Sequence, residues 1–243
     1  MQYIMTKMEL TFWTLVILIL WVASAYDLND KIASMEKQIE GLMSQVDRQT
    51  QPVTTFIRWG RTECPVGACD VYSGYVGGSY WSESGSGGDY QCLPSHPQWG
   101  NYTDGTARWG ASMFGAEYDV LPPDRRNPFL GTNSPTSDPN SLHNRDVPCT
   151  VCSVPRSETL MIPAWKACPA GWKKEYNGYL MAEHRAHLSN KNFICVDEAP
   201  EAMPGGMARE QGALLYAVEA KCGSLPCPLY VQGRELTCVV CTK

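Results

Sequence analysis

The stretch CPAGWKKEYNGYL at Cys168–Leu180 repeats a pattern found 104 residues earlier, in CPVGACDVYSGYV at Cys64–Val76. Both stretches begin with C-P-x-G and contain Y-x-G-Y. Further matches follow in the same order: Asp89-Tyr90-Gln91-Cys92 with Asn192-Phe193-Ile194-Cys195, and a closing C-x-x-C at Cys149–Cys152 and at Cys238–Cys241. Four landmarks in one order indicate an internal duplication, which predicts two similar subdomains related by a pseudo-twofold.

Both copies are predicted to consist of short strands. The segments with high β-propensity, separated by Gly and Pro, are Val53–Trp59, Asp70–Tyr75, Gly212–Val218 and Leu236–Cys241. We therefore expect an all-β fold, with a first β-rich repeat at 52–154 and a second at 155–243, sharing one core. Ser82–Gly88 and Pro122–Asn144 lack periodicity and are expected to be surface loops.

Composition excludes several classes of protein. The chain has 243 residues and a net charge of −5, which argues against a general nucleic-acid binder with a basic surface. Its 44% hydrophobic and 19% charged residues argue against wholesale disorder. No run of Gly-X-Y triplets exists, so this chain contains no collagen triple helix.

Eleven cysteines indicate an extracellular protein held by disulfides. A four-thiolate zinc site or a redox motif is the alternative for the two C-x-x-C motifs. In a strand, residues i and i+3 point to opposite faces, so the two cysteines of each motif should bond to different partners. Cys222 and Cys227 are close enough in sequence to pair locally. One thiol is left over, and Cys69 is the candidate, either free or bridging chains, because its repeat position is occupied by Lys173.

The apolar run Leu10–Ala25 has two interpretations. Its sixteen residues span roughly 24 Å as a helix, less than a bilayer core of about 30 Å, and it ends in the small-residue motif Ala23-Ser24-Ala25. Residues 1–25 are therefore predicted to be a cleaved signal peptide. The alternative is an uncleaved signal anchor through 10–25, giving a type II single-pass membrane protein. Both place Tyr26 onward outside the cytosol.

A heptad pattern follows in residues 26–51. Its apolar seam repeats at steps of four and three and consists of Leu28, Ile32, Met35, Ile39, Leu42 and Val46. A narrow seam favours a coiled-coil stalk over a helix packed on its own domain. The residue types at the seam positions favour a coiled coil of two helices, and a coiled coil of three helices is the alternative. About three heptads are marginal alone, so we expect the β-rich region to contribute to assembly.

The motifs C-P-x-G, Y-x-G-Y, a single Cys and C-x-V-C occur twice in this order. In this respect the chain resembles the C-terminal non-collagenous domain of type IV collagen. It is more similar still to invertebrate short-chain, C4-like collagens of the spongin type. The resemblance covers about residues 53–243 and implies an all-β domain of two subdomains that trimerises and nucleates extracellular networks. A heptad helix stands here where those proteins carry collagen triplets, so the implied role is assembly rather than fibre formation.

The same resemblance implies a disulfide pattern. Carried over residue by residue, it gives Cys64–Cys152, Cys92–Cys149, Cys168–Cys241, Cys195–Cys238 and the local pair Cys222–Cys227. The first copy has no counterpart of the local pair, and Cys69 is extra.

Candidates for chemistry are few. His184 and His187 would share a metal only if they lay on a helix, and the spacing is not that of a zinc protease. Glu117 and Glu219 are a conceivable catalytic pair, but they look like equivalent positions of the repeat, which favours a structural role. Motifs for nucleotide binding or serine catalysis are absent from the sequence. We therefore expect no catalytic residues, metal or cofactor.

Two surface features remain. Asn101 begins the glycosylation motif Asn-Tyr-Thr and is expected on an exposed loop. Aromatic residues gather in the first copy, where core packing is the expected role and a contact surface for sugar or protein is the alternative. They are Trp59, Tyr80, Trp81, Trp99, Tyr102 and Trp109.

The sequence thus predicts a non-enzymatic, secreted or membrane-anchored assembly protein whose main partner is itself, as a dimer or trimer. Other matrix proteins or glycans are possible partners, and nucleic acid is not expected. The alternative function is multivalent recognition, by a lectin or an immune-type receptor.

Overall fold

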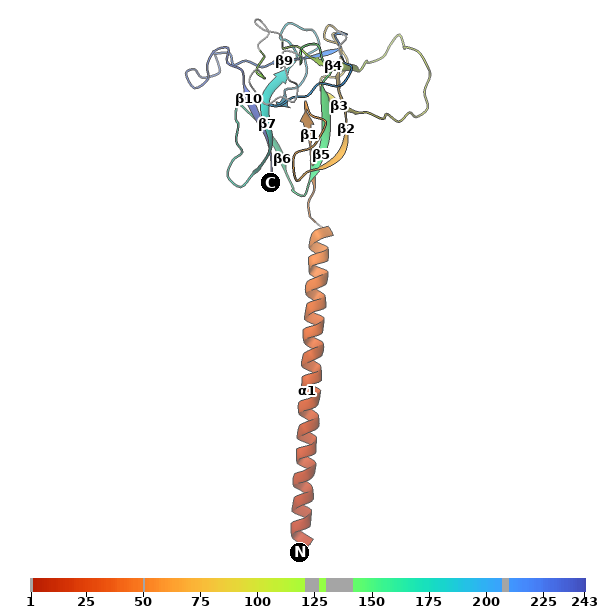
Figure 1. Cartoon of the computed structure of the whole chain (residues 1–243), viewed down its shortest axis with the longest axis vertical. Helices are drawn as coiled ribbons and strands as arrows, with labels where there is room; N and C mark the ends of the chain where they lie inside the picture. The colour runs from red at the N-terminus through yellow and green to blue at the C-terminus, as the bar shows by residue number, and fades with distance from the viewer. Residues whose placement is uncertain (1, 50, 121–126, 130–141, 207–209) are drawn as a thin grey trace. The chain divides into compact units, whose positions relative to one another are not determined.

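The computed structural model describes residues 2–49, 51–120, 127–129, 142–206 and 210–243. The chain divides into two compact units, a helical unit at residues 1–51 and a β unit at 52–243 (Figure 1). A predominantly β-sheet structure preceded by an apolar helix is as predicted. Most of the expected loop Pro122–Asn144 lies outside the described residues.

The helical unit is a single helix, α1 (Gln2–Gln49). It does not break at Ala25, so the predicted signal or anchor segment and the heptad segment are continuous. The part Phe12–Val46 is long and apolar enough to cross a membrane, by length and composition. Lys31 Nζ lies 2.7 Å from Asp27 Oδ2 one turn away, an exposed pair that supports the helix only weakly.

The first half of the β unit (residues 52–154) contributes five strands. They are β1 (Thr54–Trp59), β2 (Cys69–Gly78), β3 (Gln91–Pro94), β4 (Phe114–Tyr118) and β5 (Pro148–Val154). β5 lies between β1 and β2, and β2 also pairs with β3 and with β4. All four pairings are antiparallel.

The second half (residues 155–243) has the same pairings. Its strands are β6 (Thr159–Pro163), β7 (Lys173–Ala182), β8 (Ile194–Asp197), β9 (Ala213–Ala217) and β10 (Thr237–Thr242). β10 lies between β6 and β7, and β7 also pairs with β8 and with β9, again antiparallel. Thus β1 to β5 correspond to β6 to β10.

Two parallel pairings join the halves. Trp59 of β1 pairs with Val196 of β8, and β4 pairs with β9. Together with the antiparallel pairs they complete a circuit β7–β8–β1–β5–β2–β4–β9 that returns to β7. The larger core draws buried residues from both halves, including Trp59, Tyr118 and Leu215. The halves therefore share one core and are not separate compact units.

The repeated motifs have a physical explanation. In each C-P-x-G, the glycine has a positive φ, +90° at Gly67 and +82° at Gly171, and it turns the chain before the long strand. The Ala68 N–H donates to the Pro65 carbonyl at 3.0 Å, and the second copy repeats this bond. The motif is therefore a tight turn that requires glycine.

In each Y-x-G-Y, the first tyrosine and the glycine hold the neighbouring strand. The Tyr72 hydroxyl donates to the Cys92 carbonyl, and that of Tyr176 to the Cys195 carbonyl, both at 3.0 Å. A Cβ added to Gly178 would lie 1.8 Å from the Val196 carbonyl oxygen. The glycine is thus the only residue that lets the next strand approach this closely.

Five disulfides hold the β unit. They are Cys64–Cys152, Cys92–Cys149, Cys168–Cys241, Cys195–Cys238 and Cys222–Cys227, the pairs that the collagen resemblance implies. The two cysteines of each C-x-x-C bond to different partners, as the alternating faces of a strand require. Cys69 is exposed and unpaired within the chain.

Candidate functional site

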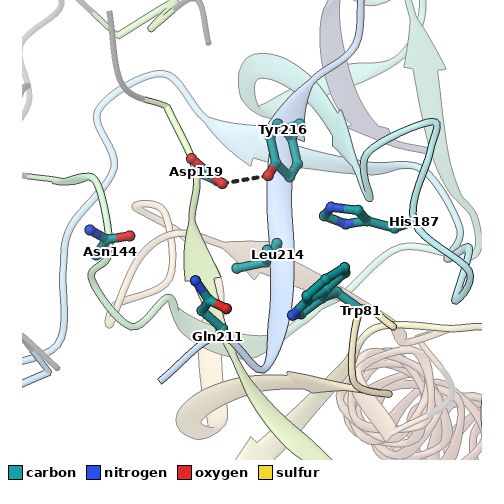
Figure 2. A pocket seen from close by; sticks show the side chains of 7 residues that line it. All are labelled: Trp81, Asp119, Asn144, His187, Gln211, Leu214 and Tyr216. Carbon is teal, nitrogen blue, oxygen red and sulfur yellow. Dashed lines mark hydrogen bonds between the residues drawn. The ribbon is translucent and has the colours of Figure 1, made fainter. Parts of the chain in front are cut away.

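A cavity of about 180 Å³ lies between the two halves of the β unit (Figure 2). Its walls come from the segment after β2, the end of β4, the segment before β5, the β7–β8 loop and β9. The first half supplies Trp81, Asp119 and Asn144, and the second half supplies His187, Gln211, Leu214 and Tyr216. We call this cavity the interhalf pocket. Neither half forms it alone.

One wall of the interhalf pocket is held by Asp119. This residue follows β4 and is buried, and its carboxylate accepts a hydrogen bond from the Tyr216 hydroxyl on β9 (Figure 2). His143 Nδ1 lies 3.2 Å from the other carboxylate oxygen. Because Asp119 has partners on both sides, Tyr216 is held in one orientation at the pocket wall.

The opposite wall is held by Glu183, a buried carboxylate just after β7. It lies 2.6 Å from Lys191 Nζ and 2.7 Å from His187 Nδ1, and it accepts the Leu214 N–H at 3.1 Å. Lys191 is itself buried, so its charge is compensated by Glu183. The imidazole of His187 lies against the Trp81 indole, with 4.8 Å between ring centroids (Figure 2).

His184 and His187, which could share a metal ion if they lay on a helix, lie in a turn instead. The His187 N–H donates to the His184 carbonyl at 2.9 Å, and the two rings are 5.1 Å apart between centroids, each also against Tyr216. Within the described residues, one group of potential metal ligands lies close together, at Cys64, Asp70 and Cys152. Its two sulfur atoms are joined in a disulfide and offer no thiolate.

The two glutamates predicted as a conceivable pair take separate partners. Glu117 is buried, and its Oε1 accepts the N–H groups of Glu210 at 2.8 Å and Gln211 at 3.2 Å. Glu219 pairs instead with Lys221 Nζ at 3.0 Å. The backbone of Glu117 forms an isolated antiparallel β-bridge with Asp146, just before β5. The backbone of Glu219 forms the same kind of bridge with Glu235, just before β10. The two glutamates thus occupy corresponding positions in the two halves.

Burial raises the pKa of the Glu117 carboxyl, the negative charges of Asp146 and Glu210 raise it further, and the two backbone N–H donors partly offset this. The pKa of Asp146 is also raised, by burial and then by Glu210. A raised pKa in the folded chain means that the folded chain binds these protons more tightly than the unfolded chain does. The stability from these groups is therefore fully present below their unfolded pKa values and is lost as pH rises through the folded ones.

Replacing Glu117 by glutamine is expected to flatten this pH dependence. Glutamine keeps the Oε1 acceptor but cannot ionise, so Glu117→Gln should lose less stability than the wild type between about pH 4.5 and pH 7. Melting temperatures across that range measure the effect. Glu219→Gln, at the corresponding position, is the control for replacing one carboxylate by an amide. Identical slopes for the wild type and Glu117→Gln would contradict the assignment.

The aromatic residues of the first half divide into three groups by burial. Trp59 is buried in the core, as the packing expectation requires. That expectation is wrong for Trp99, Tyr102 and Trp109, which are exposed in the segment between β3 and β4. This segment has no regular secondary structure, so it has no face to turn inward. Asn101 is exposed in the same segment, and Tyr80 and Trp81 are partly buried.

The six seam residues of the heptad are all exposed in the single chain, with 46–60% of each surface accessible. They are Leu28, Ile32, Met35, Ile39, Leu42 and Val46. Such a row of apolar side chains is costly to leave in water.

Most of the pocket residues could not be found from the sequence. Trp81 and His187 belong to groups that sequence patterns single out, whereas Asp119, Asn144, Gln211 and Tyr216 carry no motif. They are brought together only by the β4–β9 pairing and by the loops at its ends. No model of a known protein family matches this chain.

Proposed function

We propose that this protein is a non-enzymatic, extracellular assembly module that associates with further copies of itself. The proposal is supported by the correspondence between the halves: the same strand order, the same four pairings and the same turn, tyrosine and glycine contacts. This correspondence favours an origin by duplication, with two tandem subdomains of the type that the resemblance to the type IV collagen domain implies. Oxidised cysteines and an N-terminal apolar helix suit a secreted or membrane-anchored location.

The junction between the halves suggests how copies associate. Strand β1 of the first half lies beside β8 of the second half, with Trp59 opposite Val196. Arg58 and Asp197 form an ion pair across this junction, with Nη2 2.8 Å from Oδ2. The Tyr176 hydroxyl faces two carbonyls, that of Cys195 and, across the junction, that of Ile57 at 2.8 Å, and its one proton is shared between them.

The corresponding strands, β6 and β3, are not joined to each other. Among the described residues, β6 pairs only with β10 and β3 only with β2. A β6 edge meeting the β3 edge of the next copy would repeat the β1–β8 junction between chains. Such a contact joins two different surfaces, so copies related by rotation form a closed ring. This topological correspondence is the observation that carries the proposal.

The side chains along these edges favour association. Ile162 and Pro94 occupy the positions that correspond to Arg58 and Asp197, so the ion pair is replaced by an apolar contact. Trp165, which corresponds to Arg61, is 52% exposed beside β6, and Leu160 on β6 is 43% exposed. Covering large apolar side chains provides free energy for binding, and tryptophan is a frequent anchor residue. Pro94 and Pro163 end their strands, so side chains rather than backbone hydrogen bonds would carry the contact.

The heptad seam of α1 supports the same function. Exposed apolar residues at heptad spacing favour a parallel bundle of two or three helices. A seam of this length is marginal alone, as is one pair of edge contacts. Each raises the effective concentration for the other, so together they stabilise the oligomer. Cleavage after Ala25 would leave the seam intact.

Substitution of Trp165 by aspartate is expected to weaken the oligomer at least about tenfold. An apolar anchor at an interface is worth about 2 kcal/mol or more, and a carboxylate there would also be desolvated. Light scattering coupled to size-exclusion chromatography of the full chain in detergent measures the mass at several concentrations. The matched control is Trp109→Asp, because Trp109 is 86% exposed and belongs to neither β3 nor β6. A Trp165→Asp variant that dissociates no more readily than Trp109→Asp would overturn the proposed edge contact.

A further inference from the structure

The interhalf pocket has features that assembly does not explain. It is built from side chains of both halves, its walls are fixed by two buried carboxylates, and it is not part of the β3 or β6 edges. We propose that the interhalf pocket binds a single neutral sugar residue, such as the terminal hexose or N-acetylhexosamine of a glycan. This inference goes beyond the proposed assembly function and does not depend on it, since each chain holds a complete pocket.

The backbone at the pocket is the first observation. Asn144 and Gln211 have positive φ angles, 60° and 52°, and both line the pocket. Two of the four non-glycine residues with positive φ among the described residues thus lie at this one cavity. Asparagine tolerates this conformation, but glutamine has no such preference. Such strain is concentrated at binding sites, where the side chain has a task that glycine cannot perform.

An unsatisfied donor is the second observation. The Trp81 indole Nε1 is buried and has no hydrogen-bond acceptor among the described residues. In Figure 2 this nitrogen is on the side of the ring towards Gln211. A buried N–H without an acceptor costs free energy, which an oxygen atom of a ligand would recover. The ligand must therefore carry an acceptor on this side of the pocket.

Charge and size define the ligand further. Glu183 pairs with the buried Lys191, and the Asp119 carboxylate is engaged by the Tyr216 hydroxyl and by His143, so neither carboxylate is free to bind a cationic ligand. The remaining groups, the amides of Asn144 and Gln211, offer donors and acceptors together, which is what hydroxyl groups require. A volume of about 180 Å³ is the space of roughly six water molecules at ~30 Å³ each, enough for one small ring. Trp81 and Leu214 supply apolar surface for the C–H face of such a ring.

The test is a titration of the full chain with individual methyl glycosides of glucose, galactose, mannose and N-acetylglucosamine. Isothermal calorimetry and saturation-transfer NMR measure the binding. We expect at least one of the four to bind with a dissociation constant in the millimolar range or tighter. The variant Gln211→Gly should weaken that binding about tenfold or more, while its melting temperature stays equal to or above that of the wild type, because glycine relieves the positive φ.

Ala164→Gly is the matched control, because Ala164 also has a positive φ, 62°, but does not line the pocket. It should bind the sugar as the wild type does. The proposal is overturned if none of the four glycosides binds the wild type, or if Gln211→Gly binds as tightly as the wild type. Binding of sialic acid or of lysine methyl ester without any neutral sugar would also overturn it. Trp165→Asp should retain the binding, so failure of the assembly proposal and failure of this one are distinguishable.

Discussion

Replacing Gly178 by alanine is expected to destabilise the β unit by more than about 3 kcal/mol, because the new Cβ would lie 1.8 Å from the Val196 carbonyl oxygen. A backbone atom cannot move aside as a flexible side chain does, so β8 would have to separate from β7. For a domain of this size the loss corresponds to a fall in melting temperature of roughly 6–12 °C. Gly74→Ala should have a similar effect, since its Cβ would lie 1.9 Å from the Leu93 carbonyl oxygen.

Circular dichroism melting curves of the two variants measure this effect. Gly85→Ala is the control, because a Cβ at Gly85 would meet nothing within 4 Å and the glycine has no positive φ. It should melt within a degree or two of the wild type. If Gly178→Ala melted together with Gly85→Ala, the close approach of β8 to β7 would be wrong, and with it the explanation of the Y-x-G-Y motif.

Removing the disulfide that closes the longest loop is expected to lower the stability of the β unit by about as much as Gly178→Ala does. Cys64 and Cys152 are 88 residues apart, and the chain-entropy relation gives about 4–5 kcal/mol for a loop of this length. Cys222 and Cys227 are five residues apart, for which the same relation gives about 2 kcal/mol. The double variant Cys64→Ser/Cys152→Ser should therefore lose about twice the stability lost by Cys222→Ser/Cys227→Ser.

Denaturant unfolding without reducing agent, compared at equal protein concentration, measures both losses. The short-loop variant is the matched control for the chemistry of replacing two cysteines by two serines. Equal losses would contradict the expectation that loop closure dominates, and would indicate that burial of Cys152 or local strain decides the cost instead.

The features predicted from the sequence are those encoded by local motifs. C-P-x-G and Y-x-G-Y show the duplication in the sequence, and Y-x-G-Y lies in a segment predicted as a strand; the glycine turn of the first motif and the close strand contact of the second are seen only in the structure. The alternation of a strand likewise assigns different partners to the two cysteines of each C-x-x-C. Because these motifs occur twice, their repetition also indicates the correspondence of strands on which the assembly proposal rests.

The interhalf pocket could not be predicted in the same way. Asp119 and Tyr216 meet because β4 and β9 pair in parallel, a long-range contact that no local pattern encodes. The positive φ of Gln211 has no sequence signal, since glutamine is not a residue that favours it. The exposure of Trp99, Tyr102 and Trp109 differs from the packing expectation because composition does not indicate which face of an irregular segment is turned inward.

Assembly through the β6 and β3 edges is tested most directly by rebuilding the β1–β8 ion pair at the proposed contact between copies. Ile162→Arg and Pro94→Asp place, on β6 and β3, the residues that Arg58 and Asp197 supply within the chain. The association constants of the full chain, the two single variants and the double variant, measured by analytical ultracentrifugation in detergent, form a double-mutant cycle. We expect each single variant to associate more weakly than the wild type. The association free energy of the double variant should be more favourable, by about 1 kcal/mol or more, than the sum of the two single effects predicts. A wild type that is monomeric at every concentration, or a cycle with no coupling, would contradict assembly through these edges.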